Sequence, residues 1–312
     1  MGKVAFVFPG QGAQSVGMGR DIFESDTAAK DVFDRADKAL GYSLSTLIFE
    51  GPDAELKITY HTQPALLTTS IAYLELFKAK GLKPDFLAGH SLGEYSALVA
   101  AGVLSFEDAV RTVRARGEFM EQAVPSGQGA MAAVLGGERE SLLQLCAALT
   151  SEVGVVELAN LNCPGQIVVS GSKEGVQGLV ERGKEIGAKR VIPLEVSGPF
   201  HSSLMKPASE RLSDVLSNVP MQTALVPVVA NVTARPVQDP ESIRELLVEQ
   251  VHSSVLWEDS VAWLIEQGVD TFVEIGSGTV LNGLIKKIDK SVKLYSINSK
   301  EALDQFQLET TN

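Results

Sequence analysis

Residues 89–93 read Gly-His-Ser-Leu-Gly, so that Ser91 stands between two glycines in the spacing G-x-S-x-G. An apolar run at 86–88 precedes the motif and a helix-compatible run at 94–101 follows it. We therefore expect Ser91 on a sharp turn between a strand and a helix, where larger flanking residues would clash. Helix N–H groups near an exposed hydroxyl could receive an oxyanion, which is a geometry for acyl transfer. The alternative is a Gly-Ser turn that merely begins a helix.

A serine nucleophile needs a base within hydrogen-bond reach, and the chain has four histidines. His201 is the best candidate, because it lies in a rigid loop at the exit of a predicted insert, where a cleft between two domains is expected. The alternative for His201 is a helix-capping role. His90 adjoins the serine and is expected to support the turn by hydrogen bonding. His61 is expected before a helix start and His252 at a helix end.

Two further residues could contact an acyl substrate. Arg116 lies on the helix predicted after Ser105, and its guanidinium could hold a carboxylate through two hydrogen bonds. The alternative is a solvated helix charge. Gln11 lies in a glycine-flanked turn after the first predicted strand. In a doubly wound sheet that turn can share an edge with Ser91, so the Gln11 backbone N–H could be an oxyanion donor, although a plain tight turn would read the same way.

The elements that must position these residues predict an α/β fold. Residues 1–124 and 203–312 are expected to form a large hydrolase-like body with a mostly parallel sheet, and 125–202 a small ferredoxin-like insert in the order β-α-β-β-α-β. Strands are expected at 4–8, 85–88, 130–135, 155–159, 166–170, 189–196, 226–232 and 271–276. Helices are expected near 20–40, 62–80, 91–102, 138–150, 173–187, 203–218, 240–250 and 257–267, and from 105 and 280 onward. The last dozen residues look polar and weakly structured.

Composition restricts the class of protein. The 312 residues, 45% hydrophobic and 21% charged, are typical of a soluble globular chain with a sizeable core. The net charge of −12 argues against nucleic acid and anionic membranes as partners, because both attract positive surfaces. Cys146 and Cys163 have no metal-binding or C-x-x-C spacing, which favours two thiols in a reducing cytosol. No membrane span or signal peptide is evident, so we expect a cytoplasmic protein.

Four segments together resemble the malonyl-CoA:acyl carrier protein transacylases, the free-standing bacterial acyltransferases of fatty acid synthesis. They are Phe-Pro-Gly-Gln-Gly-Ala-Gln at 8–14, Gly-His-Ser-Leu-Gly-Glu-Tyr at 89–95, Arg-Ala-Arg-Gly-Glu-Phe-Met at 114–120 and Gly-Pro-Phe-His-Ser at 198–202. Residues 159–166 and 273–278 also match this family. The resemblance covers nearly the whole chain, with the motifs in order and at the right spacing, so it is far more specific than the serine motif alone.

The resemblance implies a role for each matching residue. Ser91 would be the nucleophile and His201 its base. Gln11 and Leu92 would supply the backbone N–H groups of the oxyanion hole, and Arg116 would pair with the free carboxylate of a malonyl group. Malonyl would pass from malonyl-CoA to Ser91 and then to the phosphopantetheine thiol of acyl carrier protein, with no cofactor and no metal.

Further positions follow from the same resemblance. Gln250 matches a glutamine whose backbone carbonyl orients the histidine, which would explain why no acidic partner for His201 is evident. A loop with Asn160 and Asn162 would line the small-domain side of the cleft. Phe200 resembles the residue of malonyl-selecting members, whereas methylmalonyl-selecting relatives commonly carry a smaller one.

An acidic chain that receives an acidic carrier protein needs a local basic patch. The candidates are Lys184, Lys189, Arg190, Lys286 and Lys287. Three other functions remain open at this point: a serine esterase or thioesterase with the same turn, a carrier-binding scaffold with an inactive site, and an acyltransferase of a polyketide pathway.

Overall fold

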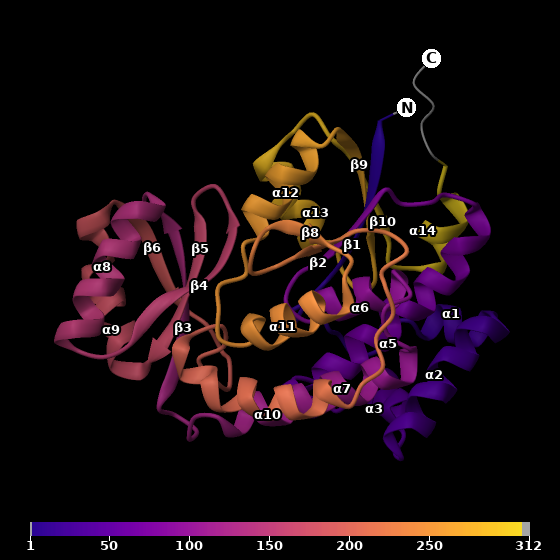
Figure 1. The fold of residues 1–312 in the computed structure, drawn as a ribbon, viewed down its shortest axis with the longest axis horizontal. Helices are drawn as coiled ribbons and strands as arrows, with labels where there is room; N and C mark the ends of the chain where they lie inside the picture. Colours follow the sequence, from indigo (N-terminus) through magenta and orange to yellow (C-terminus); the bar gives the residue numbers. More distant parts are fainter. Residues whose placement is uncertain (1, 308–312) are drawn as a thin grey trace.

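The computed structural model describes residues 2–307, whose strands form two separate sheets (Figure 1). The strands are β1 (Lys3–Phe8), β2 (Phe86–Gly89), β3 (Gly129–Gly136), β4 (Val156–Cys163), β5 (Gln166–Ser172), β6 (Ala188–Pro193), β7 (Val228–Ala230), β8 (Arg235–Val237), β9 (Val269–Ile275) and β10 (Lys293–Ile297). The larger sheet has the order β10-β9-β1-β2-β7-β8, with every pair parallel except β7 and β8. The expected α/β fold with a mostly parallel main sheet is confirmed.

Fourteen α-helices within residues 2–307 surround these sheets. They are α1 (Arg20–Ser25), α2 (Thr27–Leu40), α3 (Leu44–Glu50), α4 (Asp53–Leu56), α5 (Thr59–Phe77), α6 (Gly93–Ala100), α7 (Phe106–Gln122), α8 (Arg139–Glu152), α9 (Lys173–Arg182), α10 (Lys206–Ser217), α11 (Pro240–Gln250), α12 (Trp257–Glu266), α13 (Val280–Ile288) and α14 (Lys300–Gln305). No helix of this part of the chain is long and apolar enough to span a membrane.

Strand β1 is apolar from Val4 to Phe8 because both of its faces are covered there. Phe6 and Phe8 belong to the core that includes α5, α6 and α7, whereas Ala5 and Val7 pack with α12 and α13 on the opposite face. A parallel strand buried on both faces reads as a continuous apolar run rather than an alternating one. Phe8 pairs with Gly89, so the turn after β1 and the turn after β2 lie together at one edge of the sheet.

The smaller sheet is antiparallel, in the order β4-β5-β3-β6. Helices α8 and α9 pack on it around Leu145, Leu149, Val176 and Leu179. Figure 1 shows this sheet and its two helices set apart from the larger sheet. Along the chain its elements are β3, α8, β4, β5, α9 and β6.

Several element boundaries differ from the predictions. Asn160 and Asn162 lie in β4 and not in a loop, because the strand continues to Cys163 and its edge is covered at Asn160 by a parallel bridge to Val255. The helix expected over 20–40 is divided at Asp26, whose side chain caps α2. β8 and β10 were not predicted.

The chain end also differs from its prediction. Residues 300–305 form α14, which Ser299 caps by accepting the backbone N–H of Ala302, so the weakly structured end begins later than expected. The rest of that prediction, at 308–312, lies outside the described residues.

The two glycines beside Ser91 are required by close backbone contacts. A Cβ atom on Gly89 would lie 2.0 Å from the carbonyl carbon of Gly93, and one on Gly93 would lie 2.1 Å from the carbonyl oxygen of Phe8. These are backbone atoms and cannot rotate away. The G-x-S-x-G spacing thus lets β1, β2 and the start of α6 meet at one point.

We therefore expect Gly93→Ala to lower the free energy of unfolding by about 3 kcal/mol, because the added methyl group would clash with backbone atoms of Phe8. Gly283→Ala is the matched control: Gly283 lies in α13, a Cβ there would meet nothing within 4 Å, and the variant should gain about 0.5–1 kcal/mol. Urea denaturation measures both changes. Equal stability of the two variants would contradict the steric argument.

Candidate active site

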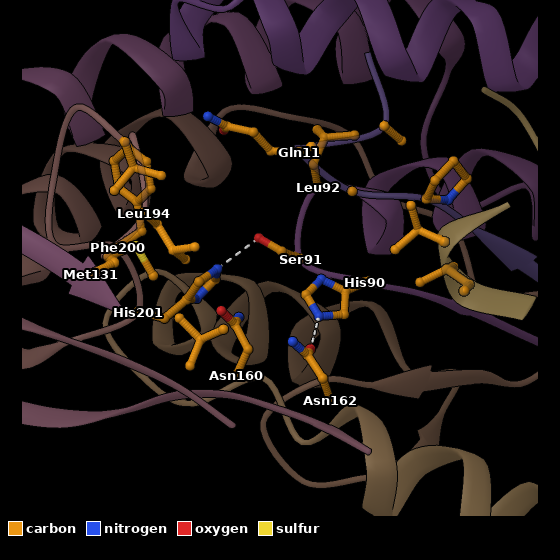
Figure 2. A pocket seen from close by; sticks show the side chains of 18 of the residues that line it. Gln11, His90, Ser91, Leu92, Met131, Asn160, Asn162, Leu194, Phe200 and His201 are labelled. Atoms are coloured by element: carbon orange, nitrogen blue, oxygen red, sulfur yellow. Dashed lines mark hydrogen bonds between the residues drawn. The ribbon is translucent and has the colours of Figure 1, made fainter. Parts of the chain in front are cut away.

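Ser91 lies two residues after the end of β2 and has a positive φ of 51°, which is uncommon for any residue but glycine. Its backbone N–H donates to Oδ1 of Asn231 at 2.7 Å, which stabilises this conformation. Its Oγ lies 2.7 Å from Nε2 of His201 (Figure 2). The structure therefore brings together the two residues that the sequence proposed as nucleophile and base, although they are 110 positions apart.

His201 is held in one tautomer by a backbone carbonyl. Its Nδ1 lies 2.8 Å from the carbonyl oxygen of Gln250, which can only accept, so Nδ1 carries the proton and Nε2 is free to accept the proton of Ser91. Burial, followed by the positive charge of Arg116, lowers the pKa of His201 to about 3. The imidazole is therefore neutral at physiological pH, as a general base must be.

Gln11 and Leu92 both line the cleft that contains Ser91, on the same side of it in Figure 2. Within residues 2–307, neither backbone N–H forms a hydrogen bond. The side chain of Gln11 donates to Thr59 Oγ1 at 3.3 Å, which restrains the turn after β1. Two unused N–H groups beside a serine hydroxyl can receive the oxygen of a tetrahedral intermediate.

Arg116 is 1% exposed, so it is not the solvated helix charge that its position on α7 also allowed. Its guanidinium donates to Oε1 of Gln63 at 2.8 Å, to Oε1 of Gln250 at 2.9 Å and to Oγ of Ser91 at 3.2 Å. It forms no salt bridge with any residue from 2 to 307. A buried cation held by neutral oxygens beside the nucleophile can bind an anionic group of a substrate.

The cleft lies between the two sheets and has a volume of about 260 Å³. On the side of the smaller sheet it is lined by Met131 of β3, by Asn160 and Asn162 of β4, and by Phe200, which is 5% exposed. His90 points toward β4, with Nε2 2.8 Å from Oδ1 of Asn162 (Figure 2). His90 therefore connects the serine turn to the smaller sheet.

Comparisons with known proteins agree with this arrangement. Residues 5–308 match the family model described as the acyl transferase domain. The chain belongs to the acyl transferase domain family. A malonyl CoA-acyl carrier protein transacylase of Bacillus subtilis (strain 168) is 57% identical over 304 residues, which cover 97% of this chain and 96% of that protein. The resemblance drawn from the sequence motifs is confirmed.

Solved structures of this family share the whole fold. An acyl carrier protein S-malonyltransferase of Vibrio cholerae O1 biovar eltor str. N16961 is 44% identical, with a TM-score of 0.94 over 97% of this chain and 99% of that one. A malonyl-transacylase solved in complex with its type II PKS acyl carrier protein is 42% identical, with a TM-score of 0.94 over 97% and 98% of the two chains.

The two remaining histidines lie away from Ser91. His61 is in the first turn of α5, which begins earlier than predicted, and its Nδ1 lies 3.1 Å from Nη1 of Arg114. His252 lies in the turn after α11, where its Nδ1 is 3.2 Å from Ser253 Oγ. No group of three or more His, Cys, Asp or Glu side chains within the described part of the chain could hold a metal ion.

Sequence reasoning missed three polar residues that the acyl transferase site depends on: Gln63, Glu94 and Asn231. Asn231 binds both ends of the serine turn, since its Oδ1 accepts from Ser91 N and its Nδ2 donates to the Gly89 carbonyl at 2.7 Å. Glu94 accepts the backbone N–H of Asn231 at 3.0 Å. The sequence held only weak signals for two of them. Glu94 is the one acidic residue of a mostly apolar helix, and Asn231 is an amide directly after a buried strand.

Asn231→Ala should lower the free energy of unfolding by about 3 kcal/mol, because it leaves a buried N–H and a buried carbonyl without partners. We expect Ser91 to react about tenfold more slowly with a fluorophosphonate probe, since the turn is no longer held. Asn218→Ala, at the exposed end of α10, is the control and should change stability by less than about 1 kcal/mol. An unchanged probe rate in Asn231→Ala would refute the positioning role.

Proposed function

We propose that this chain transfers the malonyl group of malonyl-CoA to the phosphopantetheine thiol of acyl carrier protein, through a malonyl ester of Ser91. The single observation that carries the proposal is a serine–histidine pair at 2.7 Å with a buried, unpaired guanidinium 3.2 Å from the same serine oxygen. The pair of Ser91 and His201 is an argument for acyl transfer. The guanidinium of Arg116 is an argument that the transferred acyl group ends in a carboxylate. The names of the relatives fit both features.

In the first half-reaction, Ser91 Oγ attacks the thioester carbonyl while His201 Nε2 takes the serine proton. The negative charge that develops on the carbonyl oxygen is received by the N–H groups of Gln11 and Leu92, each worth about 3 kcal/mol. The carbonyl of Gln250 stabilises the imidazolium through Nδ1–H. His201 then returns its proton to the sulfur, and CoA leaves as a thiol.

In the second half-reaction, the phosphopantetheine thiol of the carrier occupies the position that CoA has left. His201 takes the proton of this thiol, the sulfur attacks the malonyl ester, and the proton returns to Ser91 Oγ. The two half-reactions are mirror images, so one base and one oxyanion hole serve both.

Arg116 selects the acyl group. With a malonyl group in place, the guanidinium exchanges its contact to Ser91 Oγ for the free carboxylate, which it can bind through two hydrogen bonds. An acetyl group offers no such partner and leaves a buried cation unsatisfied. Gln63 and Gln250 keep the guanidinium in place in both cases.

The domain organisation of the proposal follows the sheets. Residues 1–124 and 203–312 form the hydrolase-like body that carries the nucleophile, and 125–202 form a ferredoxin-like insert, which the strand order β4-β5-β3-β6 supports. The cleft then lies where the two parts meet. The expectations of a cytoplasmic location and of cofactor-free chemistry stay predictions.

The carrier would dock at a basic patch beside the cleft. Lys287 donates to Gln166 Oε1 at 3.1 Å, and Gln166 lines the cleft. Leu135 of β3 pairs with Gln166 on one side and Arg190 on the other, so Arg190 lies two strands from that rim. Lys184, Lys189 and Lys286 are also exposed, and among residues 2–307 none of these five cations forms a salt bridge. Free positive charge of this kind attracts an acidic partner.

A serine esterase or thioesterase is the alternative with the same first step. It requires water to attack the Ser91 ester, and an esterase of uncharged acyl groups would give the buried Arg116 no function. An acyltransferase of a polyketide pathway would use the same chemistry with a different carrier, as in the relative solved with its type II PKS carrier protein.

Incubation with malonyl-CoA in the absence of carrier should leave a stable malonyl adduct on Ser91, because no thiol is then present to accept the malonyl group. Intact-mass and peptide mass spectrometry measure the adduct and its position. Ser91→Ala is the control and should carry none. Rapid release of free malonate with no adduct would favour the esterase and contradict the transferase.

Arg116→Ala should lower kcat/KM for malonyl-CoA about 100-fold and spare or improve that for acetyl-CoA, since only malonyl loses a charged hydrogen-bond partner. Arg114→Ala is the matched control on the same helix, because Arg114 pairs with Glu118 and stacks on Tyr60 away from the cleft. Equal losses for both acyl groups in Arg116→Ala would refute the carboxylate clamp.

A further inference from the structure

Glu94 is a second buried charge behind the nucleophile, and the transfer mechanism above does not use it. It lies in the first turn of α6, and its side chain is 2% exposed. Its Oε2 accepts two hydrogen bonds, from Gln250 Nε2 at 2.8 Å and from the backbone N–H of Asn231 at 3.0 Å. Its Oε1 forms no hydrogen bond with any residue from 2 to 307. One oxygen of this carboxylate is therefore free to carry a proton.

Glu94 and Arg116 face each other across a single amide. Oε1 of Gln250 accepts from Arg116, and Nε2 of the same side chain donates to Glu94. Neither charged group forms a salt bridge within residues 2–307. The buried region behind Ser91 thus holds one positive and one negative group, and it is neutral when Glu94 is ionised.

The surroundings of Glu94 offer little other compensation. The titratable groups that face it are Arg116 of α7 and Tyr95 of α6, while α5 and α11 contribute the neutral side chains of Gln63 and Gln250. Strands β2 and β7 carry no titratable side chain. Burial raises the pKa of Glu94 to about 7, against the lowering effect of its two hydrogen bonds and of Arg116. Both protonation states are therefore accessible near neutral pH.

A malonyl carboxylate on Arg116 would add a second negative charge to this region. Two carboxylates that share one cation in a dry site do not both stay ionised without a large cost. We propose that Glu94 takes up a proton when the malonyl group binds, so that the buried region keeps one negative charge for its one positive charge. Glu94 is in this view a positioning residue, which adjusts the field around Arg116 to the charge of the acyl group. The inference rests on the proposed function.

The acyl transfer itself neither consumes nor releases a proton. The serine proton passes through His201 to the sulfur of CoA, which leaves as a thiol, and the malonyl group forms its ester with Ser91. The proton on Oε1 of Glu94 comes from solvent and is additional to this exchange. Acetyl-CoA undergoes the same exchange without bringing a carboxylate, so it provides the baseline.

The test is single-turnover acylation of the full chain in weakly buffered solution with a pH indicator. Acylation of Ser91 is measured by mass spectrometry on the same samples. At pH 7 we expect a measurable fraction of a proton taken up per malonylated serine, after subtraction of the acetyl-CoA signal, because Glu94 is then partly ionised beforehand. Glu94→Gln, whose amide oxygen can still accept both N–H groups, should take up none.

A steady-state measurement gives a second readout that a merely structural role would not move. Glu94→Gln mimics the protonated state and removes a negative charge from the region of the substrate carboxylate. The ratio of KM for malonyl-CoA to KM for acetyl-CoA should therefore fall about fivefold at pH 8 and change little at pH 6.

Glu274→Gln is the matched control. Glu274 is also buried, and burial raises its pKa, but it accepts the backbone N–H groups of Leu281 and Asn282 at the start of α13. This variant should keep the wild-type proton uptake even if its Tm falls.

The inference is overturned if wild-type protein is malonylated on Ser91 with the same proton signal as with acetyl-CoA, a comparison that needs no variant. It is also overturned if folded Glu94→Gln keeps the wild-type uptake. Absence of any malonyl adduct on wild-type Ser91 would instead overturn the proposed function.

Discussion

The arrangement of the site depends on Gln250, because it contacts Ser91, His201 and the buried Arg116. Its backbone carbonyl accepts from His201, its side-chain oxygen accepts from Arg116, and its side-chain nitrogen donates to the carbonyl of Ser91 at 3.0 Å. Gln250 ends α11, where the last carbonyls have no partner within the helix. Such a carbonyl carries part of the negative end of the helix dipole. It can therefore orient His201 and stabilise its protonated form without placing a full negative charge beside the anionic substrate of the proposed mechanism.

Two features together fix the conformation of the serine turn: the two glycines that flank it and the side chain of Asn231. Gly89 and Gly93 remove the atoms that would keep β1, β2 and α6 apart, so the turn can exist. Asn231 then holds the positive φ of Ser91 by binding the Ser91 N–H and the carbonyl of Gly89. Steric space alone would permit several conformations of the turn. The buried amide of Asn231 selects the one that directs Oγ at His201, and the turn is rigid because both of its partners are backbone atoms of the turn.

The sequence predicted the features that depend on neighbours along the chain. The strand, turn and helix around Ser91, the cap of α7 by Ser105 and the order of elements in 125–202 all follow from local patterns of apolar and turn residues. Features set by distant partners were not predictable in this way. Asn160 looks like a loop residue until Val255 pairs with it, and the burial of Arg116 follows from oxygens on α5 and α11. His201 was found because few histidines compete for the role, and its carbonyl partner came only with the family resemblance.

In the proposed mechanism, the position of Arg116 also links substrate selection to the strength of the base. Burial is the main cause of the low pKa of His201, and the positive charge of Arg116 is the second, since it makes a neighbouring imidazolium costly. When the negative charge moves from Glu94, behind the Gln250 amide, to a substrate carboxylate on the Ser91 side of Arg116, it comes closer to His201 and makes that histidine a stronger base. An acyl group without a carboxylate meets a weaker base, and water that enters the empty cleft meets the same weak base. A buried cation that forms no salt bridge thus makes the serine reactive toward the substrate that brings a carboxylate to it.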